Sequence, residues 1–594
     1  MRCGHFPFPL PLGTRDIQEI DIFIILIDAA HLLTQINNRT FCTGFTETKM
    51  SSTIPSQSTS KMLNQEAHPD RHARLIAALR DPRCYPHPAE KIEVLETHIS
   101  WVVLTGPYAY KIKKPVNLGF LDFTTLEQRG LCCREELRLN RRLAPRLYLD
   151  VVDITGSPER PRIGGDGAAI EYAVKMTQFG QDQLASRLLG SGGLAPQHIA
   201  QLAGKIAAFH QQAAAAEAGS RFGSPQIVKA QAAQNFGQIA ALPGAAEDGA
   251  MFEDLRHWTE REFAAVENRM GLRQSAARVR ECHGDLHLGN IALIDGEITP
   301  FDCIEFNAEL RWNDVASEAA FLVMDLIDRG RPDFAFLFLS DYLELSGDYG
   351  AMTVLRFYLV YRAMVRAKVH CLRAHQPGIG DAERKRLLGA YRGYLDLARR
   401  FTHPSRPSLV IMHGLSGSGK TTLSHALLQA LGAIRIRSDV ERKRLHHMTT
   451  LERAAPGIAA GIYAGEVTQQ VYQRLAGLAR ETIAAGYSVI LDAAFLGRWQ
   501  RDLMRDLARA LGAPFTIASL QAPEPVLRER IVRRGGEGHD ASDADLAVLS
   551  HQLATQDPLA DDEAACAVML DATSSAATLA ATPAWRALLE RASS

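Results

Sequence analysis

The sequence predicts a chain of two folded parts, an α+β domain followed by an α/β domain built on a parallel sheet. Before residue 403, short β-branched runs come first and a long, mainly helical stretch follows, which is the order typical of an α+β domain. After residue 407, buried-type strands alternate with helical patterns, as they do in parallel sheets whose strands are connected by helices. With 594 residues, the chain is also longer than a single hydrophobic core usually becomes.

Composition and charge are those of an ordinary globular protein, with 46% hydrophobic and 22% charged residues. The formal net charge of −1 gives no global basic bias, so we expect no nucleic-acid partner. Nine scattered cysteines without a C-x-x-C pair favour reduced thiols, which predicts a cytoplasmic protein. The apolar run Ile20–Leu33 contains two aspartates and is too short to cross a bilayer, so no membrane segment is expected.

The chain divides into regions of different composition. From Thr46 to about Pro69 it is rich in Ser, Thr and Gln without an apolar period, which predicts a poorly structured extension. Two interpretations of this stretch stay open: a genuine extension, or translation that begins at Met50 or Met62. The predicted regions are the extension 1–69, a first lobe 70–177, a helical lobe 178–402, a linker 403–407 that contains two prolines, and the α/β domain 408–594.

The elements of the first lobe follow from local patterns. Glu93–Thr97, Trp101–Leu104 and Tyr108–Lys113 are typical of an antiparallel meander. The charged amphipathic stretch Leu126–Leu143 predicts a helix that ends at Ala144-Pro145. Further strands are expected at Leu147–Ile154 and Ala169–Met176.

The most specific motif is Gly414-Leu415-Ser416-Gly417-Ser418-Gly419-Lys420-Thr421, which has the P-loop form G-x-x-x-x-G-K-[ST]. A buried-type strand precedes it and a helical pattern, Thr421–Leu431, follows. Glycines let backbone N–H groups surround phosphate oxygens, and the helix N-terminus adds positive partial charge. We therefore expect ATP phosphates to be bound by Gly414, Gly417, Ser418, Gly419, Lys420, Thr421 and Thr422, with the Thr421 hydroxyl on Mg²⁺.

Three later residues favour a kinase over other P-loop proteins. Asp439 follows a strand-like run and is a candidate base for an acceptor hydroxyl, although a helix N-cap is an equal alternative. Asp492 ends the apolar strand Val489-Ile490-Leu491 and is a candidate Mg²⁺ ligand. Arg530 lies in a segment that resembles the lid helix of nucleotide and gluconate kinases, and its alternative is a solvated helix face. No N-K-x-D motif follows the P-loop, which disfavours a GTPase.

A second motif lies in the helical lobe, at His283-Gly284-Asp285-Leu286-His287-Leu288-Gly289-Asn290. It has the H-x-D-L-x-x-x-N form of a kinase catalytic loop, and a predicted hairpin then leads to Asp302. Here the sequence resembles the aminoglycoside phosphotransferase-like branch of the protein-kinase fold over roughly His72 to Arg400. The resemblance implies a two-lobed kinase-like domain in which Asp285 accepts the acceptor's proton, while Asn290 and Asp302 hold Mg²⁺ on ATP.

The same resemblance implies an ATP-anchoring lysine and its glutamate partner. Lys111 and Glu136 fit these roles, and their neighbours Lys113 and Glu135 remain alternatives. Glu171–Met176 would be the hinge strand against adenine. No G-x-G-x-x-G precedes Lys111, so backbone and hydroxyl groups of the Thr97–Ser100 loop must cover the phosphates, which leaves room for a weakened or inactive site.

Taken together, the two halves resemble bacterial proteins described as bifunctional aminoglycoside phosphotransferase/ATP-binding proteins. Further strings that carry this resemblance are Thr97-His98-Ile99-Ser100-Trp101, Lys113-Lys114-Pro115-Val116, Tyr361-Arg362-Ala363 and Asp492-Ala493-Ala494-Phe495-Leu496.

The resulting prediction is an ATP- and Mg²⁺-dependent phosphotransferase with two nucleotide sites that act on small-molecule hydroxyl groups. Three matters stay open: the acceptors, since fold does not define substrate, the oligomeric state and the coupling between the sites. One alternative is a single active P-loop kinase with a non-catalytic kinase-like domain. A less favoured one is a P-loop ATPase that works with a protein partner.

Overall fold

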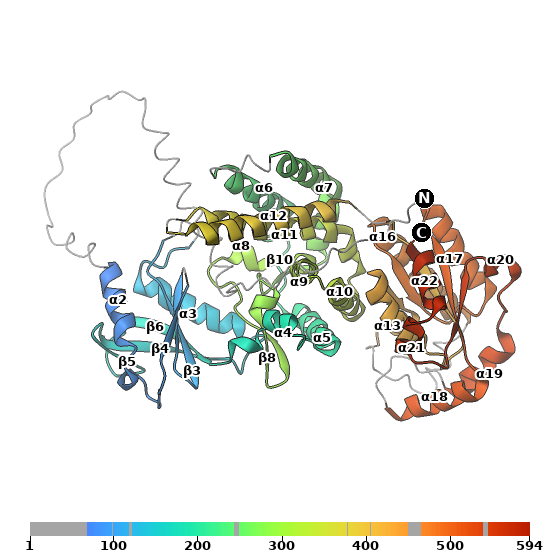
Figure 1. The fold of residues 1–594 in the computed structure, drawn as a ribbon, viewed down its shortest axis with the longest axis horizontal. Coiled ribbons are helices and arrows are strands. Elements are labelled where there is room, and N and C mark those ends of the chain that lie inside the picture. Colours follow the sequence, from blue (N-terminus) through green and yellow to red (C-terminus); the bar gives the residue numbers. More distant parts are fainter. Residues whose placement is uncertain are drawn as a thin grey trace, which may run out of the picture.

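Figure 1 shows the fold in a computed structural model of the chain. The structure describes residues 68–97, 99–117, 121–242, 249–376, 378–403, 406–448, 465–537 and 545–593. Apart from its last two residues, the predicted extension 1–69 lies outside the described residues, and so do Met50, Met62 and the middle of the predicted linker. The domain boundaries therefore stay predictions.

The first lobe is a six-stranded antiparallel sheet, ordered β1-β2-β3-β6-β4-β5, with helix α3 packed on β6 and β4. The predicted meander is confirmed by β1, β2 and β3. Strand β5 was not predicted, because it is short and consists largely of arginine and proline. The elements are α2 (His68–Ala78), β1 (Glu93–Glu96), β2 (Ser100–Leu104), β3 (Tyr108–Lys113), α3 (Leu126–Asn140), β4 (Tyr148–Ser157), β5 (Arg160–Ile163) and β6 (Glu171–Thr177).

The second lobe is mainly helical and lies in the middle of the molecule in Figure 1. Two small antiparallel pairs, β7 with β10 and β8 with β9, interrupt the helices. Its strands are β7 (Val279–Glu281), β8 (Ile291–Ile294), β9 (Glu297–Pro300) and β10 (Trp312–Asp314). Its α-helices are α4 (Ala185–Ser191), α5 (Pro196–Gln212), α6 (Pro225–Ala240), α7 (Gly249–Ser275), α8 (Ala308–Arg311), α9 (Val315–Asp328), α10 (Pro332–Ser346), α11 (Met352–Ala374) and α12 (Asp381–Thr402).

The C-terminal part is built on the predicted parallel sheet, which has five strands ordered β12-β13-β11-β14-β15. Its strands are β11 (Leu409–His413), β12 (Ile434–Arg437), β13 (Val489–Asp492), β14 (Phe515–Gln521) and β15 (Ala567–Asp571). Its helices are α13 (Lys420–Leu431), α14 (Ser438–Leu445), α16 (Gly465–Ala484), α17 (Arg498–Leu511), α18 (Glu524–Glu537), α19 (Leu546–Thr555), α20 (Asp561–Ala564), α21 (Ala576–Ala580) and α22 (Pro583–Ser593). Both predicted fold classes are thus confirmed.

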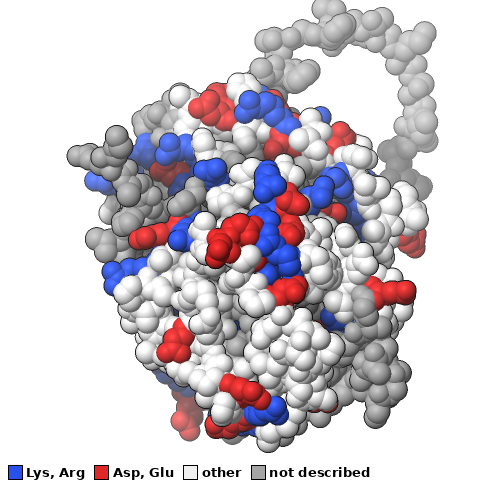
Figure 2. Space-filling view, turned by 90° about the vertical axis from the view of Figure 1, so that its right-hand side faces the viewer, with Lys and Arg blue, Asp and Glu red and all other residues white. Residues whose placement is uncertain are grey.

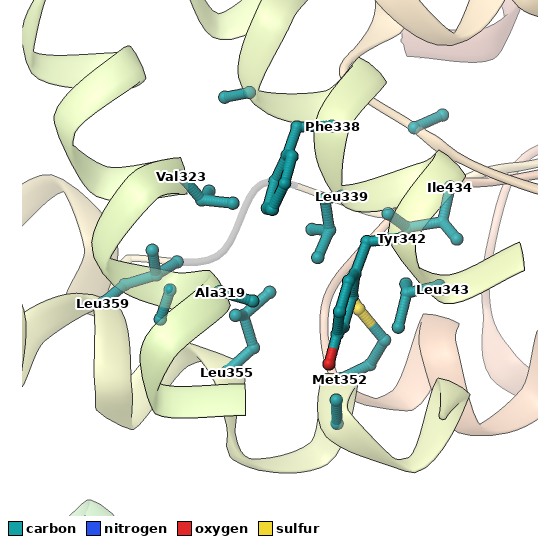
Figure 3. Close-up of a cluster of buried hydrophobic side chains, with 14 of the residues drawn as sticks. Ala319, Val323, Phe338, Leu339, Tyr342, Leu343, Met352, Leu355, Leu359 and Ile434 are labelled. Carbon is teal, nitrogen blue, oxygen red and sulfur yellow. The ribbon is translucent and has the colours of Figure 1, made fainter. Parts of the chain in front are cut away.

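The hydrophobic core runs without a break from the helical lobe into the parallel sheet. Helix α10 packs on α5 and α9 on one side and on α13 and β12 on the other. Figure 3 shows Ile434 of β12 among Leu339, Tyr342 and Leu343 of α10. Because β12 is an edge strand of the sheet, α10 closes an edge that would otherwise be open to solvent.

The outer face of the C-terminal part carries interleaved positive and negative side chains in a central band, above a largely uncharged area (Figure 2). The exposed ion pairs of α17 and α20, such as Arg498 with Asp562, belong to this part of the molecule. Among the described helices, none combines the length and the apolar character that crossing a bilayer requires.

Candidate phosphotransfer sites

The P-loop has the backbone that its sequence demands. Gly417 and Gly419 have φ values of +83° and +86°, in the left-handed region that favours glycine. A Cβ on Gly417 would lie 2.8 Å from the Leu527 carbonyl oxygen of α18, so that helix packs directly on the loop. The Lys420 ammonium donates to the carbonyl oxygens of Gly414 and Leu415, both at 2.9 Å, which places it inside the loop.

One pocket of about 1030 Å³ joins the P-loop to the other residues predicted for this site. Asp439, Asp492 and Arg530 all line it together with residues 417 to 422. Gly414 lies at the start of the loop and is not among the lining residues. A second part of the pocket wall is formed by Arg442, Tyr472, Trp499 and Gln500, which sequence reasoning did not single out.

The three later residues of this site reach it from separate elements. Asp439 lies in the first turn of α14, whose N-cap is Arg437, so the N-cap alternative for Asp439 is not what the structure shows. Arg530 projects from α18, and its Nη1 lies 4.0 Å from where a Cβ on Gly419 would be. It therefore faces the phosphate-binding loop and not bulk solvent, and Arg533 lines the same pocket.

The oxygen donors at this site fit a magnesium ion. Asp492 ends β13 and is 6% exposed, and its Oδ2 accepts a 3.0 Å hydrogen bond from Ser424 Oγ. Thr421 lies in the first turn of α13 and lines the same pocket. Carboxylate and hydroxyl oxygens are the hard donors that Mg²⁺ prefers.

The candidate catalytic loop of the helical lobe is buried. Asp285 is fully buried, and its Oδ2 accepts a 2.8 Å hydrogen bond from Asn290 Nδ2. Its second oxygen, Oδ1, has no hydrogen-bond partner among the described residues. His287 Nδ1 accepts from Gly289 N–H, which leaves the proton on Nε2, 3.3 Å from Asp285 Oδ2. A buried carboxylate oxygen without a partner is unusual and suits a proton acceptor.

A second carboxylate, missed at the sequence level, holds this loop in place. Glu318 accepts hydrogen bonds from the backbone N–H groups of His283 and Gly284, at 3.0 and 2.7 Å. His210 Nε2 lies 3.0 Å from Glu318, and His210 Nδ1 lies 2.9 Å from the Tyr342 hydroxyl of α10. Although burial acts to raise it, these hydrogen bonds hold the pKa of Glu318 well below its ordinary range.

The contacts of the two lysines of β3 show which glutamate pairs with them, a choice that the sequence left open. Lys111 Nζ lies 2.9 Å from Glu136 and 2.6 Å from Asp302, and Lys113 contacts Glu136 and Glu305. Glu135 instead contacts Arg138 and Arg311. The structure therefore brings Glu136, and not Glu135, to the lysines.

The two lysines differ in their access to the cleft. The Lys111 side chain is 12% exposed and reaches Asp302, whereas the Lys113 side chain is fully buried. Burial acts to raise the pKa of Asp302, but the nearby Lys111 ammonium keeps this pKa below its ordinary value. Lys111 is thus the lysine that is accessible to a ligand in the cleft, and Lys113 is the buried ion-pair partner of Glu136 and Glu305.

The other predicted parts of this site surround these residues. Asp302 has a φ of +65°, and its N–H donates to the Tyr148 hydroxyl at 3.2 Å. The oxygens of Asn290 and Asp302 fit Mg²⁺ by donor type. Strand β6, the expected hinge, lies between β3 and β4 in the sheet. Phe179, just after the end of β6, packs edge-on against Phe301. Between β1 and β2, the Thr97 hydroxyl donates to the Ser100 carbonyl oxygen and accepts from the Ser100 N–H.

Known proteins resemble this chain along most of its length. A family described as an AAA domain matches residues 409–559. Protein Rv2004c of Mycobacterium tuberculosis and protein Mb2027c of Mycobacterium bovis, both described as uncharacterized, are each 31% identical over 487 residues. The match covers 80% of this chain and 94% of each relative. The chain belongs to the same family as these mycobacterial proteins.

Solved structures resemble this member of the family in parts. A sugar kinase from Janibacter sp. HTCC2649 is 26% identical, with a TM-score of 0.25, and the match covers 32% of this chain and 96% of that one. The amicoumacin kinase hAmiN, in complex with AMP-PNP, Ca²⁺ and Ami, is 14% identical with a TM-score of 0.36, over 56% of this chain and 95% of that one. An aminoglycoside phosphotransferase from Alicyclobacillus acidocaldarius is 14% identical with a TM-score of 0.33, over 54% and 92%.

The family assignment made from the sequence is confirmed. The AAA-domain match falls on the parallel sheet that carries the P-loop, and the two-lobed part precedes it in the chain. The roles of individual residues in the two sites remain to be tested.

Proposed function

We propose that this protein is an ATP- and Mg²⁺-dependent phosphotransferase with two nucleotide sites, each passing the γ-phosphoryl group to a hydroxyl of a small molecule. The observation that carries the proposal is the pocket in which the P-loop, Asp439, Asp492 and Arg530 meet. Its volume lies at the upper end for ligand pockets and leaves space beside the phosphate-binding loop for an acceptor.

Each P-loop residue has a distinct role in this proposal. The backbone N–H groups of residues 417 to 422 and Lys420 bind the phosphates, and Arg530 offsets negative charge on the transferring group. Asp439 takes the proton from the acceptor hydroxyl. Mg²⁺, held by Thr421 and Asp492, neutralises phosphate charge when it is bound.

The kinase-like site is proposed to work with a comparable set of groups. Lys111, held by Glu136, anchors the nucleotide phosphates, while Asn290 and Asp302 provide oxygens for the metal. Asp285 receives the acceptor's proton on Oδ1, which has no hydrogen-bond partner in the part of the chain that the structure describes. The intact loop geometry, with Asn290 bonded to Asp285, favours a working site over a binding-only module.

A labelled-ATP screen against a metabolite pool tests this function in the full chain. We expect Lys420→Ala to abolish one set of phosphorylated products and Asp285→Asn to abolish another. Asp295→Asn, in the exposed turn between β8 and β9, is the matched control and should change neither set.

Three other outcomes would change the assignment. If Asp285→Asn left every product in place, the kinase-like domain would be a binding or regulatory module. Turnover of ATP that needs no acceptor would point to an ATPase. If wild-type protein phosphorylated nothing, the proposal would fail.

A further inference from the structure

The two domains meet at the strand that leads into the P-loop site. Strand β12 and the start of α14 carry Arg435, Arg437 and Asp439 in close succession. The helical lobe reaches this segment through α10, which supplies Ser340, Asp341 and Glu344. Figures 1 and 3 show α10 lying between the rest of its own lobe and the parallel sheet.

The contact between α10 and β12 includes a hydrogen bond from a backbone N–H group. Arg435 N–H of β12 donates to Ser340 Oγ at 3.1 Å, so a hydroxyl from α10 satisfies an N–H at the edge of the sheet. The Arg435 guanidinium lies 3.2 Å from Glu344 Oε2 and 3.5 Å from Asp341 Oδ1. These groups are largely buried, and buried polar groups that are paired in this way fix the register between two elements.

Glu344 also contacts Arg437, which in turn lies close to Asp492 of the P-loop pocket. Its Oε1 lies 3.3 Å from Arg437 Nη1, while Arg437 Nε lies 3.8 Å from Asp492 Oδ2. The exposed fractions of the three side chains are 9%, 12% and 4%, so solvent screens these charges weakly. One arginine from β12 therefore stands between a glutamate of the kinase-like lobe and the candidate metal ligand of the P-loop site.

This arrangement matters for metal binding because Arg437 and Mg²⁺ compete for the same carboxylate. A guanidinium that pairs fully with Asp492 would neutralise the charge that attracts the metal. Glu344 supplies the opposing carboxylate, and the Arg437–Asp492 separation is longer than that of a charge-assisted hydrogen bond. Ser424 Oγ, at 3.0 Å from the same Asp492 oxygen, is neutral and does not compete in this way.

We propose that Glu344, a residue of the kinase-like lobe, is a positioning residue of the P-loop site: it holds Arg437 so that Asp492 stays available to Mg²⁺. The inference rests on the proposed Mg²⁺–nucleotide site and deepens it, since the P-loop site then depends on a side chain from the other domain. The P-loop domain alone would lack this control of its metal ligand.

The test measures nucleotide binding and needs no acceptor. Binding of a fluorescent, non-hydrolysable ATP analogue to the full chain is titrated with Mg²⁺, and the component lost in Lys420→Ala defines the P-loop site. We expect Glu344→Gln to raise the Mg²⁺ concentration for half-saturation by about tenfold or more, as for loss of one charged hydrogen bond.

A second substitution separates competition from simple loss of structure. Glu344→Gln combined with Arg437→Gln removes the competitor and should return the Mg²⁺ requirement to that of wild type. Arg437→Gln alone should leave it equal or lower. Asp341→Asn is the matched control, because Asp341 pairs with Arg435 and forms no ion pair with Arg437 among the described contacts, so it should change the requirement much less than Glu344→Gln does.

Two results would overturn the inference while leaving the proposed function in place. One is an unchanged Mg²⁺ requirement in Glu344→Gln while Lys420-dependent binding persists. The other is a double variant that stays as impaired as Glu344→Gln, since a merely structural interface would behave in that way. Wild-type protein without any Lys420-dependent binding would overturn the proposed function itself, and this inference with it.

Discussion

In the kinase-like domain most charged groups of the candidate site are buried and several are ion-paired, whereas Asp439 and Arg530 of the P-loop domain line an open pocket. Lys111, Glu136 and Asp302 form one ion-paired cluster, and Asp285 is fully buried. In the P-loop domain, Asp439 and Arg530 face a pocket of about 1030 Å³. The difference shows two ways to build a candidate phosphate site: from side-chain pairs between distant segments, and from the backbone of one continuous loop.

The contrast has a consequence for mutation. In a paired cluster, removal of one charge leaves another buried charge without compensation, so stability and ligand binding change together. In a backbone-built pocket, removal of one side chain mainly affects chemistry or affinity. The predictions below test this contrast, from the largest expected effect to the smallest.

The largest effect is expected at the open pocket from Asp439→Asn. As the proposed proton acceptor, Asp439 should contribute about 10²- to 10⁴-fold to turnover of the P-loop site, with little change in nucleotide affinity. Steady-state kinetics on an acceptor found in the screen would measure this. Asp506→Asn, on the exposed face of α17, is the control. Unchanged turnover in Asp439→Asn would remove this residue from the mechanism.

The paired cluster should respond differently at its two lysines. Lys113→Met takes this partner away from buried Glu305 and leaves Glu136 with Lys111 alone, so it should lower the free energy of unfolding by about 3–5 kcal/mol. Lys111→Met should mainly weaken nucleotide binding at the kinase-like site, by roughly tenfold or more. Denaturant unfolding and analogue binding in a Lys420→Ala background measure the two effects. Equal destabilisation by both substitutions would contradict the separate roles inferred for them.

A buried charge on α11 gives the helical lobe a pH response. Burial lowers the pKa of Lys368 to about 7, against an ordinary value near 10.5. Between these values the unfolded chain binds more protons than the folded one, so this lysine's contribution to stability rises with pH. Relative to wild type, Lys368→Met should gain about 3 kcal/mol at pH 8, and almost none of this gain should remain at pH 10.5.

Urea unfolding at both pH values checks this expectation. Lys385→Met, at an exposed position of α12, is the control and should show a difference from wild type that does not depend on pH. A pH-independent difference in Lys368→Met as well would contradict the prediction.

The smallest effect is expected at the contact between the domains. Ser340→Ala would leave the buried N–H of Arg435 without its acceptor, at a cost of about 1–2 kcal/mol in the free energy of unfolding. Ser550→Ala should cost less, because the exposed Ser550 hydroxyl donates to the Leu546 carbonyl oxygen of its own helix. If Ser340→Ala changed nothing, the edge of β12 would not depend on α10 for its register.

Sequence reasoning was most successful where the chemistry lies in a continuous string. The residues of the P-loop and of the catalytic loop are neighbours in the chain, and each backbone conformation follows from glycines and short polar residues in fixed order. Such motifs therefore predicted both the fold classes and the loops that the structure shows. Strand β5 was not predicted, because a four-residue edge strand with charged side chains has no clear hydrophobic period.

Ion pairs and hydrogen bonds between distant segments could not be predicted from the sequence. Lys113 and Glu305 are 192 positions apart, and Glu318 lies 34 positions after Gly284 of the loop that it supports. The choice between Glu135 and Glu136 depends on which face of α3 packs on the sheet, since adjacent helical residues point about 100° apart. Helix phase relative to a sheet is a property of packing, and local pattern does not contain it.

The sequence by itself determined where the P-loop and the candidate catalytic loop lie and which side chains they carry, because backbone conformation over a few residues is a local matter. Only the tertiary structure decided which carboxylates meet which cations. Glu344 reaches Arg437 across 93 positions because α10 closes the edge of the other domain's sheet. Contacts of this kind depend on how whole elements pack, and hydrophobic burial sets that packing over the entire chain.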